Sequence, residues 1–517
     1  MSKKKIEIIL LIPIFFYSLY CSITIGASWD EFYHYKNGDN IFRYILSLGT
    51  LEYKSANFIY HYGFYDFLAS FFSKNFTKNF LVESHHIFNL FFSIGSIFGI
   101  YQVTKKLFNL KIAKICFLLC IFNPIYFGHF SINPKDTIIA FSYIWIFYII
   151  LKYFQSLKDY NKRVNYVIYL IFLLSLGLSI RLTFLVLLLP LFLILLIEFF
   201  KKENIKNLKL LLIDLIIIFV SSFIITIIFW PDTHGNILKD PFVYIFQYFD
   251  NFLSSSFGLP FGIINGSFYE IQNTPWFYLF ISLFHKLPIY ILMSFLLTPF
   301  LFLDKNFKKK FLSKNYFYVF INIIFLFLMV LIFKPGINDG IRYFLYIIPL
   351  ILIISSLTIF YIFQFSNIFF KSTFIILIIF NLFTFFKLTP YHYAFINILN
   401  GKYENNLNKY EVDYWGTSLK ELVIKSEKEK LFTDNKRYLF SSCGLNQNNL
   451  DFYLDKYTNI EYSFVSNNEN YDYIFFINRL NDSSLDFKLI DTCYNNFFKK
   501  EVLSVKRNNL SFAFISK

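Results

Sequence analysis

The stretch Leu208–Trp230, LKLLLIDLIIIFVSSFIITIIFW, decides the fold class, because it is long and almost wholly apolar. A helix needs about 20 such residues to cross the roughly 30 Å of hydrocarbon in a bilayer. Similar runs recur along the 517 residues, which are 56% hydrophobic and 16% charged with a mean hydropathy of +0.50. A water-soluble protein of this length needs far more polar surface. The sequence therefore predicts a multi-pass membrane protein.

By the length criterion we expect about eleven spans in an all-α bundle over residues 1–388. Arg181 in the middle of the run Tyr166–Phe200 predicts two short helices that meet near the outer surface. The remaining spans are expected near Ile6–Ala27, His86–Val103, Ala113–Phe127, Asp136–Tyr153, Leu208–Trp230, Leu287–Leu303, Tyr316–Phe333, Tyr343–Phe363 and Thr373–Phe386.

The net charge of +15 indicates topology rather than a nucleic-acid partner. Lysines gather before the first apolar run and between later ones, at 3–5, 105–114, 158–163, 201–202 and 305–314. Cytoplasmic segments of membrane proteins carry such an excess of positive charge. These positions argue against nucleic acid as a partner. With the N-terminus in the cytoplasm, an odd number of spans places the C-terminal tail outside, so we expect a bacterial inner-membrane protein with a periplasmic C-terminus.

Two long loops are expected on the external side. The first covers residues 28–83, where Asp39–Leu48 and Tyr60–Phe72 have mixed apolar and polar faces that suit helices lying in the membrane interface. The second covers residues 231–275 and carries Gly, Asn, Asp and Pro at turn-like spacing.

Residues 389–517 are rich in Asn, Asp, Lys, Glu and Ser and predict a small extracytoplasmic α/β domain. Cys443 and Cys493 fall in this domain and can pair if it lies outside the cytoplasm. We expect a hairpin turn at Asn508–Asn509. Strands are expected at Arg437–Ser442, Tyr471–Ile477, Glu501–Ser504 and Leu510–Ile515, and a helix near Ser418–Glu427.

The motif Trp29–His34, which follows the first span, is the strongest candidate for chemistry. Asp30 in a cleft could accept a proton from an acceptor hydroxyl or amine as that group attacks a sugar carbon. Glu31 or His34 could orient Asp30 or contact the substrate. The alternative is an ordinary acidic loop start that caps an interfacial helix, and spacing alone leaves both interpretations open.

A second candidate lies in the external turn His129–Asp136. Asn133-Pro134 makes the turn, and Asp136 begins the next helix, where its charge suits the helix dipole. The functional interpretation places Asp136 opposite Asp30 as a further catalytic carboxylate, with Lys135 near a phosphate.

The third candidate is the external loop Asn338–Tyr343. Arg342 suits bidentate pairing with a lipid-linked phosphate, with Asp339 beside it, although an arginine at the membrane edge can also snorkel to headgroups. Arg181 and Lys286 are further basic residues expected near the outer surface, where snorkelling is the simpler interpretation.

The topology places these residues from well-separated stretches at one membrane face. Charged residues at membrane depth are costly and usually functional. Their convergence is the strongest argument that they form one site, with Asp30, Glu31 and Asp136 catalytic. The substrate-binding residues are then expected to be His34, Lys135, Arg181, Lys286, Asp339 and Arg342.

At this point the sequence resembles the GT-C glycosyltransferases, especially family 39, which contains protein O-mannosyltransferases and the lipid A aminoarabinose transferase. Over about residues 1–420, the resemblance rests on short motifs and on their order. These are Asp30-Glu31, the turn with Asp136, Pro275–Tyr278 followed by Lys286–Pro288, Arg342-Tyr343 with Pro349, Pro390–Tyr393 and Asp413–Ser418. The last two segments resemble bacterial dolichyl-phosphate-mannose mannosyltransferase-like members.

The resemblance implies a GT-C helical bundle and a polyprenyl-phosphate sugar as donor. Asp30 would be the base of an inverting transfer, with the donor phosphate at Arg342. No nucleotide or nicotinamide cofactor is implied. Some related enzymes use a divalent metal, but Asp30, Glu31 and Asp136 do not establish a metal site. The acceptor, a glycolipid or a protein, stays open.

The main alternative is a transporter or flippase for lipid-linked saccharides. Such a protein would place its charges near the membrane midplane and on both sides of its cycle. Here the acidic residues cluster at one face, beside long external loops and a folded tail. A membrane-anchored structural protein would need only one span. The sequence therefore favours an enzyme.

Overall fold

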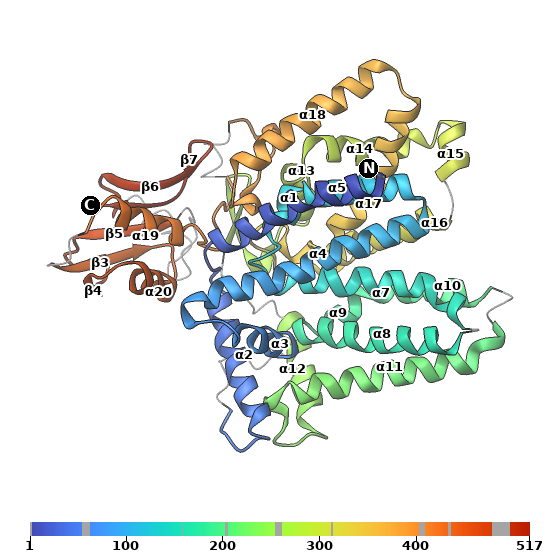
Figure 1. The fold of residues 1–517 in the computed structure, drawn as a ribbon, viewed down its shortest axis with the longest axis horizontal. Coiled ribbons are helices and arrows are strands. Elements are labelled where there is room, and N and C mark those ends of the chain that lie inside the picture. Colours follow the sequence, from blue (N-terminus) through green and yellow to red (C-terminus); the bar gives the residue numbers. More distant parts are fainter. Residues whose placement is uncertain are drawn as a thin grey trace.

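The computed structural model describes residues 3–53, 63–157, 159–201, 205–253, 261–311, 314–402, 409–432, 436–477 and 497–517. Within these residues, long helices run side by side in one body and a smaller sheet domain sits at one end of it (Figure 1). The helices of the body are α1 (Lys3–Thr24), α4 (Leu81–Leu107), α5 (Leu110–Ile121), α6 (Pro124–Gly128), α7 (Asp136–Ser156), α8 (Tyr160–Ile180), α9 (Phe184–Leu187), α10 (Leu189–Phe199), α11 (Leu208–Ile228), α14 (Ile289–Leu301), α15 (Lys305–Phe311), α16 (Lys314–Phe333), α17 (Ile347–Phe365) and α18 (Ile368–Lys387).

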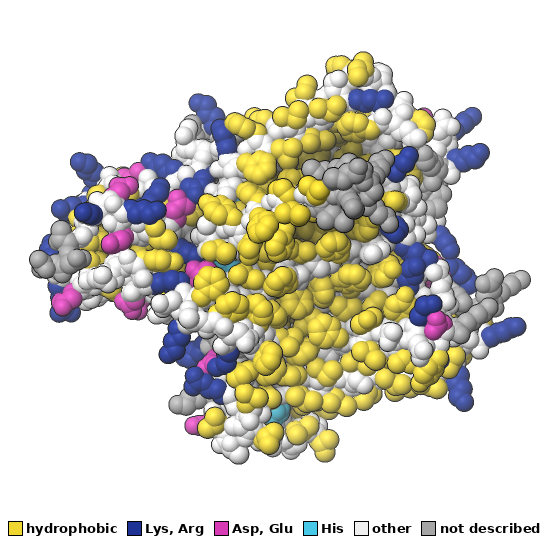
Figure 2. Space-filling model, viewed as in Figure 1, with side chains coloured by type: hydrophobic (Ala, Val, Ile, Leu, Met, Phe, Trp, Pro, Cys, Tyr) yellow, Lys and Arg dark blue, Asp and Glu magenta, His cyan; other side chains and the backbone are white. Residues whose placement is uncertain are grey.

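Seven of the described helices are long and apolar enough to cross a membrane: α4, α7, α8, α11, α16, α17 and α18. Shorter apolar helices, α10, α14 and the stretch Leu11–Thr24 of α1, lie among them. Figure 2 shows apolar side chains over the middle of the body and Lys and Arg gathered towards its ends, as a bilayer requires. The multi-pass membrane prediction is confirmed, although the seven long helices are fewer than the expected eleven spans.

One expected span is divided in two, and the break expected in a second apolar run is present; local chemistry explains both breaks. The run Ala113–Phe127 divides into α5 and α6 at Asn123-Pro124, where the Asn123 side chain accepts from the Tyr126 N–H and caps the second helix. The run Tyr166–Phe200 breaks at Arg181, which is extended and ends α8 before α9 and α10 begin. The break expected at Arg181 is therefore confirmed, but α8 before it is a full-length span of 21 residues and not a short helix.

The segment 28–83, which was expected to be the first external loop, contains α2 (Glu31–Leu46) and α3 (Phe64–Ser73), which pack against each other. The interfacial helix expected at Asp39–Leu48 is the second half of the longer α2. The start of the one expected at Tyr60–Phe72 lies outside the described residues. The second segment is more ordered than a loop of turns, because it holds α12 (Asp240–Leu253), an antiparallel pair β1 (Phe261–Ile264) and β2 (Ser267–Glu270), and then α13 (Tyr278–Lys286).

The C-terminal domain has five described strands in the order β4-β3-β5-β7-β6. The β3 strand pairs in parallel with β4 and β5, while β7 pairs antiparallel with β5 and β6. Four of these strands and the first helix match the expected positions; β4 and α20 were not expected. The elements are α19 (Leu419–Lys428), β3 (Arg437–Cys443), α20 (Gln447–Tyr457), β4 (Glu461–Phe464), β5 (Tyr473–Ile477), β6 (Glu501–Arg507) and β7 (Leu510–Ser516).

The hairpin between β6 and β7 turns at Asn508–Asn509, as expected. Both residues have positive φ angles, 49° and 65°, which suit a two-residue turn that continues the twist of the strands. Cys443 is buried at the end of β3. Cys493 lies outside the described residues, so a pairing between the two stays a prediction.

Candidate active site

Asp30 lies at the first turn of α2, but it does not serve as an ordinary helix cap. It occupies the N-cap position without a side-chain capping hydrogen bond. Its Oδ2 instead lies 3.2 Å from Lys135 Nζ and 3.7 Å from Arg342 Nη1. The structure thus favours the functional interpretation of Asp30 over the capping one and brings together three of the expected residues.

Arg342 is held on several sides. Its Nη2 lies 2.8 Å from Asp339 Oδ2 and donates to the Tyr343 hydroxyl at 2.8 Å. The guanidinium lies over the Trp415 ring at 5.4 Å from the centroid. Asp339 has a φ of 55° and Gly340 a φ of 71°, so the loop turns sharply to bring the carboxylate back onto the arginine.

Asp136 and Arg181 form the neighbouring ion pair, with 3.0 Å between Asp136 Oδ1 and Arg181 Nη2. The Asn133 amide donates to the other Asp136 oxygen at 3.0 Å. The Arg181 guanidinium lies 5.0 Å from the centroid of the Tyr343 ring, whose other near cation is Arg342 at 4.6 Å. Tyr343 therefore joins the two ion pairs. We call Asp30, Lys135, Asp136, Arg181, Asp339, Arg342 and Tyr343 the charged cluster.

Exposure separates the three carboxylates of the charged cluster. The side chain of Asp30 is 41% exposed, whereas those of Asp136 and Asp339 are 5% and 2% exposed. A buried carboxylate that pairs with an arginine fixes the position of that arginine. Asp136 and Asp339 thus hold Arg181 and Arg342, and Asp30 is the most exposed of the three carboxylates.

Electrostatics keep Asp30 ionised. Burial by itself would raise the pKa of Asp30, but the nearby charges of Lys135 and Arg342 outweigh it and hold that pKa well below its ordinary value. The free site therefore presents a carboxylate, with two cations beside it, across the physiological pH range.

Glu31 and His34 lie outside the charged cluster. Glu31 is 2% exposed and contacts His86 Nε2 at 2.9 Å, the Tyr35 hydroxyl at 2.9 Å and the Ser28 N–H at 2.5 Å. His34 Nδ1 lies 2.9 Å from Asp66 Oδ1. The Glu31–His86 contact fastens α2 to α4 and the His34–Asp66 contact fastens it to α3, so both support the site without reaching Lys135 or Arg342.

Lys286 occupies a separate small pocket behind the Asn338–Arg342 loop. It is 4% exposed and lines this pocket with Glu411 and Tyr278. Glu411 accepts from the Asp339 N–H at 2.9 Å, and the Tyr278 hydroxyl accepts from the Gly340 N–H at 2.9 Å. Burial lowers the pKa of Lys286 to about 8, and Glu411 opposes that shift. The pocket thus supports the loop that carries Arg342.

Within the described part of the chain, no three His, Cys, Asp or Glu side chains are grouped in a way that could hold a metal ion. The carboxylates of the charged cluster are each taken up by lysine or arginine. This chemistry suits an anionic ligand.

Tyr343 and Trp415 are site residues that the sequence analysis quoted in motifs but did not assign to the site. Both rings contact the Arg342 guanidinium. A signal was available, because each lies within a motif of polar and aromatic residues. In a chain with 23% aromatic residues, however, an aromatic residue in a motif is hard to distinguish from the many others.

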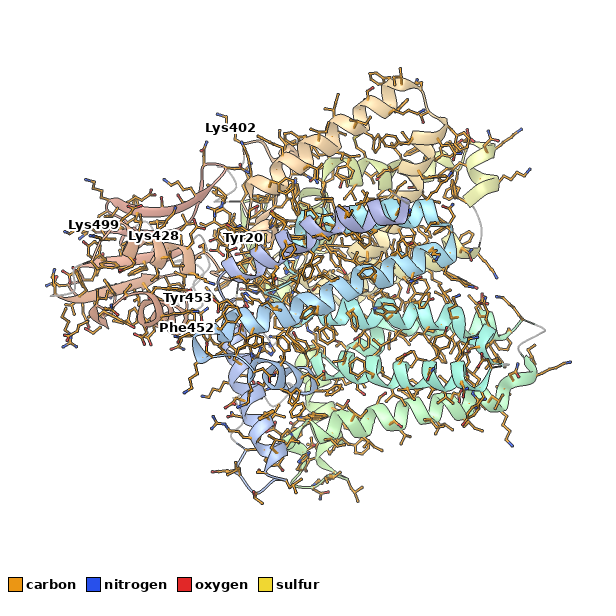
Figure 3. The ribbon with its side chains drawn as sticks, in the orientation of Figure 1. Tyr20, Lys402, Lys428, Phe452, Tyr453 and Lys499 are labelled. Carbon is orange, nitrogen blue, oxygen red and sulfur yellow. The ribbon has the colours of Figure 1, made fainter. Side chains whose placement is uncertain are left out.

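The C-terminal domain contacts the connection between α1 and α2 directly before Asp30. The Tyr453 hydroxyl accepts from the Ala27 N–H at 2.6 Å, and the Gly26 N–H donates to Thr417 O at 3.1 Å. The Phe452 ring packs on Phe32 with 4.8 Å between centroids. Figure 3 labels Phe452 and Tyr453 at the boundary between the domain and the body. The domain therefore helps to position Asp30.

A buried ion-pair network anchors the same domain. Glu83 at the start of α4 lies 2.8 Å from Lys420 and 3.1 Å from Lys456. We expect Glu83→Ala to destabilise the protein by about 3 kcal/mol, because it leaves Lys420 buried without its carboxylate. Thermal unfolding in detergent, monitored together with protease sensitivity of the C-terminal domain, measures the effect.

The control for Glu83→Ala is Lys436→Ala, which removes an exposed pair with Asp472 on the same domain. It is expected to change stability by less than about 1 kcal/mol. Equal unfolding temperatures for the two variants would show that the Glu83 network does not anchor the domain.

The fold is similar to that of a solved structure. The chain superposes on ArnT from Cupriavidus metallidurans bound to undecaprenyl phosphate with a TM-score of 0.56, at 10% identity, over 99% of this chain and 98% of that one. The apo form of that protein gives a TM-score of 0.49 at 9% identity over the same shares. The archaeal oligosaccharyltransferase AglB from Archaeoglobus fulgidus, in complex with an inhibitory peptide and a dolichol-phosphate, gives 0.45 at 12% identity over 94% and 70%.

No protein-family model matches the chain, and no curated protein does. At 10% identity the first superposition shows the fold, and the fold is the GT-C type that the sequence resemblance implied.

Proposed function

We propose that this protein is a membrane glycosyltransferase that moves a sugar from a polyprenyl-phosphate carrier to an acceptor on the extracytoplasmic face. The observation that carries the proposal is the charged cluster. It presents one exposed carboxylate between cations from separate segments, while the other two carboxylates are buried. The fold shared with ArnT, whose structure holds undecaprenyl phosphate, supports a lipid-phosphate donor.

The proposed chemistry uses Asp30 as a general base. The acceptor hydroxyl or amine attacks the anomeric carbon of the donor sugar while the bond from that carbon to the phosphate oxygen breaks. The electron pair of this bond leaves with the polyprenyl phosphate, and Asp30 takes the proton of the acceptor. Attack from the face opposite the phosphate inverts the configuration of the sugar.

Lys135 and Arg342 are proposed to receive the donor phosphate. In the free protein both cations contact Asp30. A phosphate that draws them away weakens their hold on Asp30 and lets its pKa rise towards the ordinary range, which makes it a better base. Arg181, held by Asp136, stands next to Arg342 across Tyr343 and adds positive charge for the leaving phosphate.

Orientation follows from the same proposal. The C-terminal domain lies at one end of the helical body (Figure 1), and it contacts the segment directly before Asp30 of the charged cluster. We propose a bacterial inner-membrane location, with a cytoplasmic N-terminus and with this end facing the periplasm, where a glycolipid or a protein supplies the acceptor. Nucleic acid has no part in the reaction.

The direct test supplies purified protein in liposomes with radiolabelled polyprenyl-phosphate sugars and a periplasmic extract as acceptor. Transfer of label to a product that is insensitive to mild acid supports the proposal. Movement of labelled lipid across the bilayer, without transfer from any donor, would instead establish the transporter alternative.

The acid limb of the pH profile gives a further prediction. A base is lost as the pH falls through its pKa, so a raised pKa moves that loss to higher pH. Lys135→Met removes a charge that lowers the pKa of Asp30. We therefore expect the acid limb of kcat/KM to shift upwards by about one pH unit, towards the ordinary Asp pKa of about 3.9.

Lys74→Met is the matched control for the pH profile, because Lys74 pairs with the partly exposed Asp39 on the same α2 helix. Its acid limb should coincide with that of the unaltered protein. An unmoved limb in Lys135→Met would rule out Asp30 as the titrating base.

A further inference from the structure

A groove of about 400 Å³ lies between α14 and α18, apart from the charged cluster. Its walls are mainly apolar and include Ile289, Leu377, Phe380 and Phe383. The α18 helix lies at the edge of the body, since only 17% of its apolar stretch is buried, compared with 83% for α17. The groove is therefore reached from the hydrocarbon of the membrane, and its apolar walls suit an acyl chain.

The end of this groove next to the C-terminal domain is basic. Lys387, the last residue of α18, and Lys402 line it together with Asn508 of the β6–β7 turn. Both lysines are exposed, and Figure 3 shows Lys402 beside the C-terminal domain. No acidic side chain is among the described residues that line the groove. The charge at this end is complementary to an anionic headgroup.

A buried polar atom distinguishes the groove from a plain lipid-facing surface. Asn381 is 4% exposed and lines the groove, and its Nδ2 donates to Phe122 O at 3.1 Å. Its Oδ1 has no hydrogen-bond partner among the described residues. Asn381 precedes Lys387 by six positions on one helix, which corresponds to about 9 Å along the axis. A ligand with a donor group below its head would satisfy this oxygen.

From these observations we propose that the α14–α18 groove binds an anionic membrane lipid, with its chain along α18 and its phosphate at Lys387 and Lys402. A hydroxyl or amide near the top of the chain donates to Asn381 Oδ1. A polyprenyl phosphate offers no such donor in its chain. The groove also shares no lining residue with the charged cluster, whose cations are proposed to receive the donor phosphate.

Native mass spectrometry of the full-length protein, released from detergent with added lipids, tests the site. The probes are phosphatidic acid and phosphatidylcholine with identical chains. We expect retention of phosphatidic acid over phosphatidylcholine, and we expect Lys387→Ala/Lys402→Ala to weaken retention of phosphatidic acid on the order of tenfold. Lys371→Ala, at the other end of α18, is the matched control and should behave as the unaltered protein.

The hydrogen bond to Asn381 has its own probe. Ceramide 1-phosphate carries the same kind of head as phosphatidic acid and adds an amide and a hydroxyl donor. It should be retained more strongly, and Asn381→Leu should remove that difference without reducing retention of phosphatidic acid. Leu377→Trp, which fills the groove, should weaken retention of both lipids.

Equal retention of phosphatidic acid and phosphatidylcholine would overturn the proposal, and so would an unchanged preference in the double lysine variant. The proposal would also be wrong if undecaprenyl phosphate displaced phosphatidic acid from the unaltered protein but not from Leu377→Trp. The groove would then bind the carrier lipid of the sugar donor. These measurements need no transferase activity, so their outcome is independent of the proposed reaction.

Discussion

Asp30→Asn is expected to lower the rate of sugar transfer by about 10²- to 10⁴-fold, the range that a general base contributes. The amide keeps the size of the side chain but cannot accept the proton of the attacking group. Because Asp30 is 41% exposed and makes no capping hydrogen bond, its replacement should leave folding and membrane insertion intact. The measurement is transfer of labelled sugar from a polyprenyl-phosphate donor in membranes, normalised to the amount of inserted protein.

Two further carboxylates calibrate this result. Asp39→Asn changes a partly exposed residue of the same helix that pairs with Arg43 and Lys74, and it should leave transfer unchanged. Asp136→Asn weakens the hold on Arg181 and should reduce transfer less than Asp30→Asn does. If Asp136→Asn abolished transfer and Asp30→Asn did not, the base would be Asp136.

Arg342→Ala is expected to reduce kcat/KM for the donor by about 10²- to 10³-fold, because preorganised charge at a developing anion contributes that much. The effect should fall on the donor and not on the acceptor, since the proposed partner of Arg342 is the donor phosphate. Transfer is measured as a function of each substrate in turn.

Arg342→Ala also leaves Asp339 buried without its partner, so a second variant separates binding from folding. Arg342→Lys keeps the charge but loses the two-pronged geometry and the stacking on Tyr343 and Trp415. Arg342→Lys should be as stable as the unaltered protein, but its kcat/KM for the donor should still fall by most of the amount expected for Arg342→Ala. Arg43→Ala, on the exposed face of α2, is the control and should leave kcat/KM unchanged for both substrates. Full donor affinity in Arg342→Lys would show that only charge matters at this position.

The candidate site was partly predictable, because the expected membrane topology places only a few charged residues at one face of the membrane. Asp30, Lys135, Asp136, Arg181, Asp339 and Arg342 were all assigned to that face, and the structure brings them into one cluster. Their individual roles were not predictable. Asp30 and Glu31 are adjacent, but successive residues of a helix point about 100° apart. One therefore faces Lys135 and the other is buried against His86.

Sequence by itself determined the membrane class, the break at Arg181, the α/β tail and its turn at Asn508–Asn509. These features depend on local signals, namely the length of apolar runs, the placement of lysines and the backbone preferences of single residues. Only the tertiary structure decided which carboxylate is exposed, that Lys286 is buried behind the Arg342 loop, and that Tyr453 holds the segment before Asp30. Those outcomes depend on packing between segments far apart in the chain, and that packing sets both the burial and the partners of each charge.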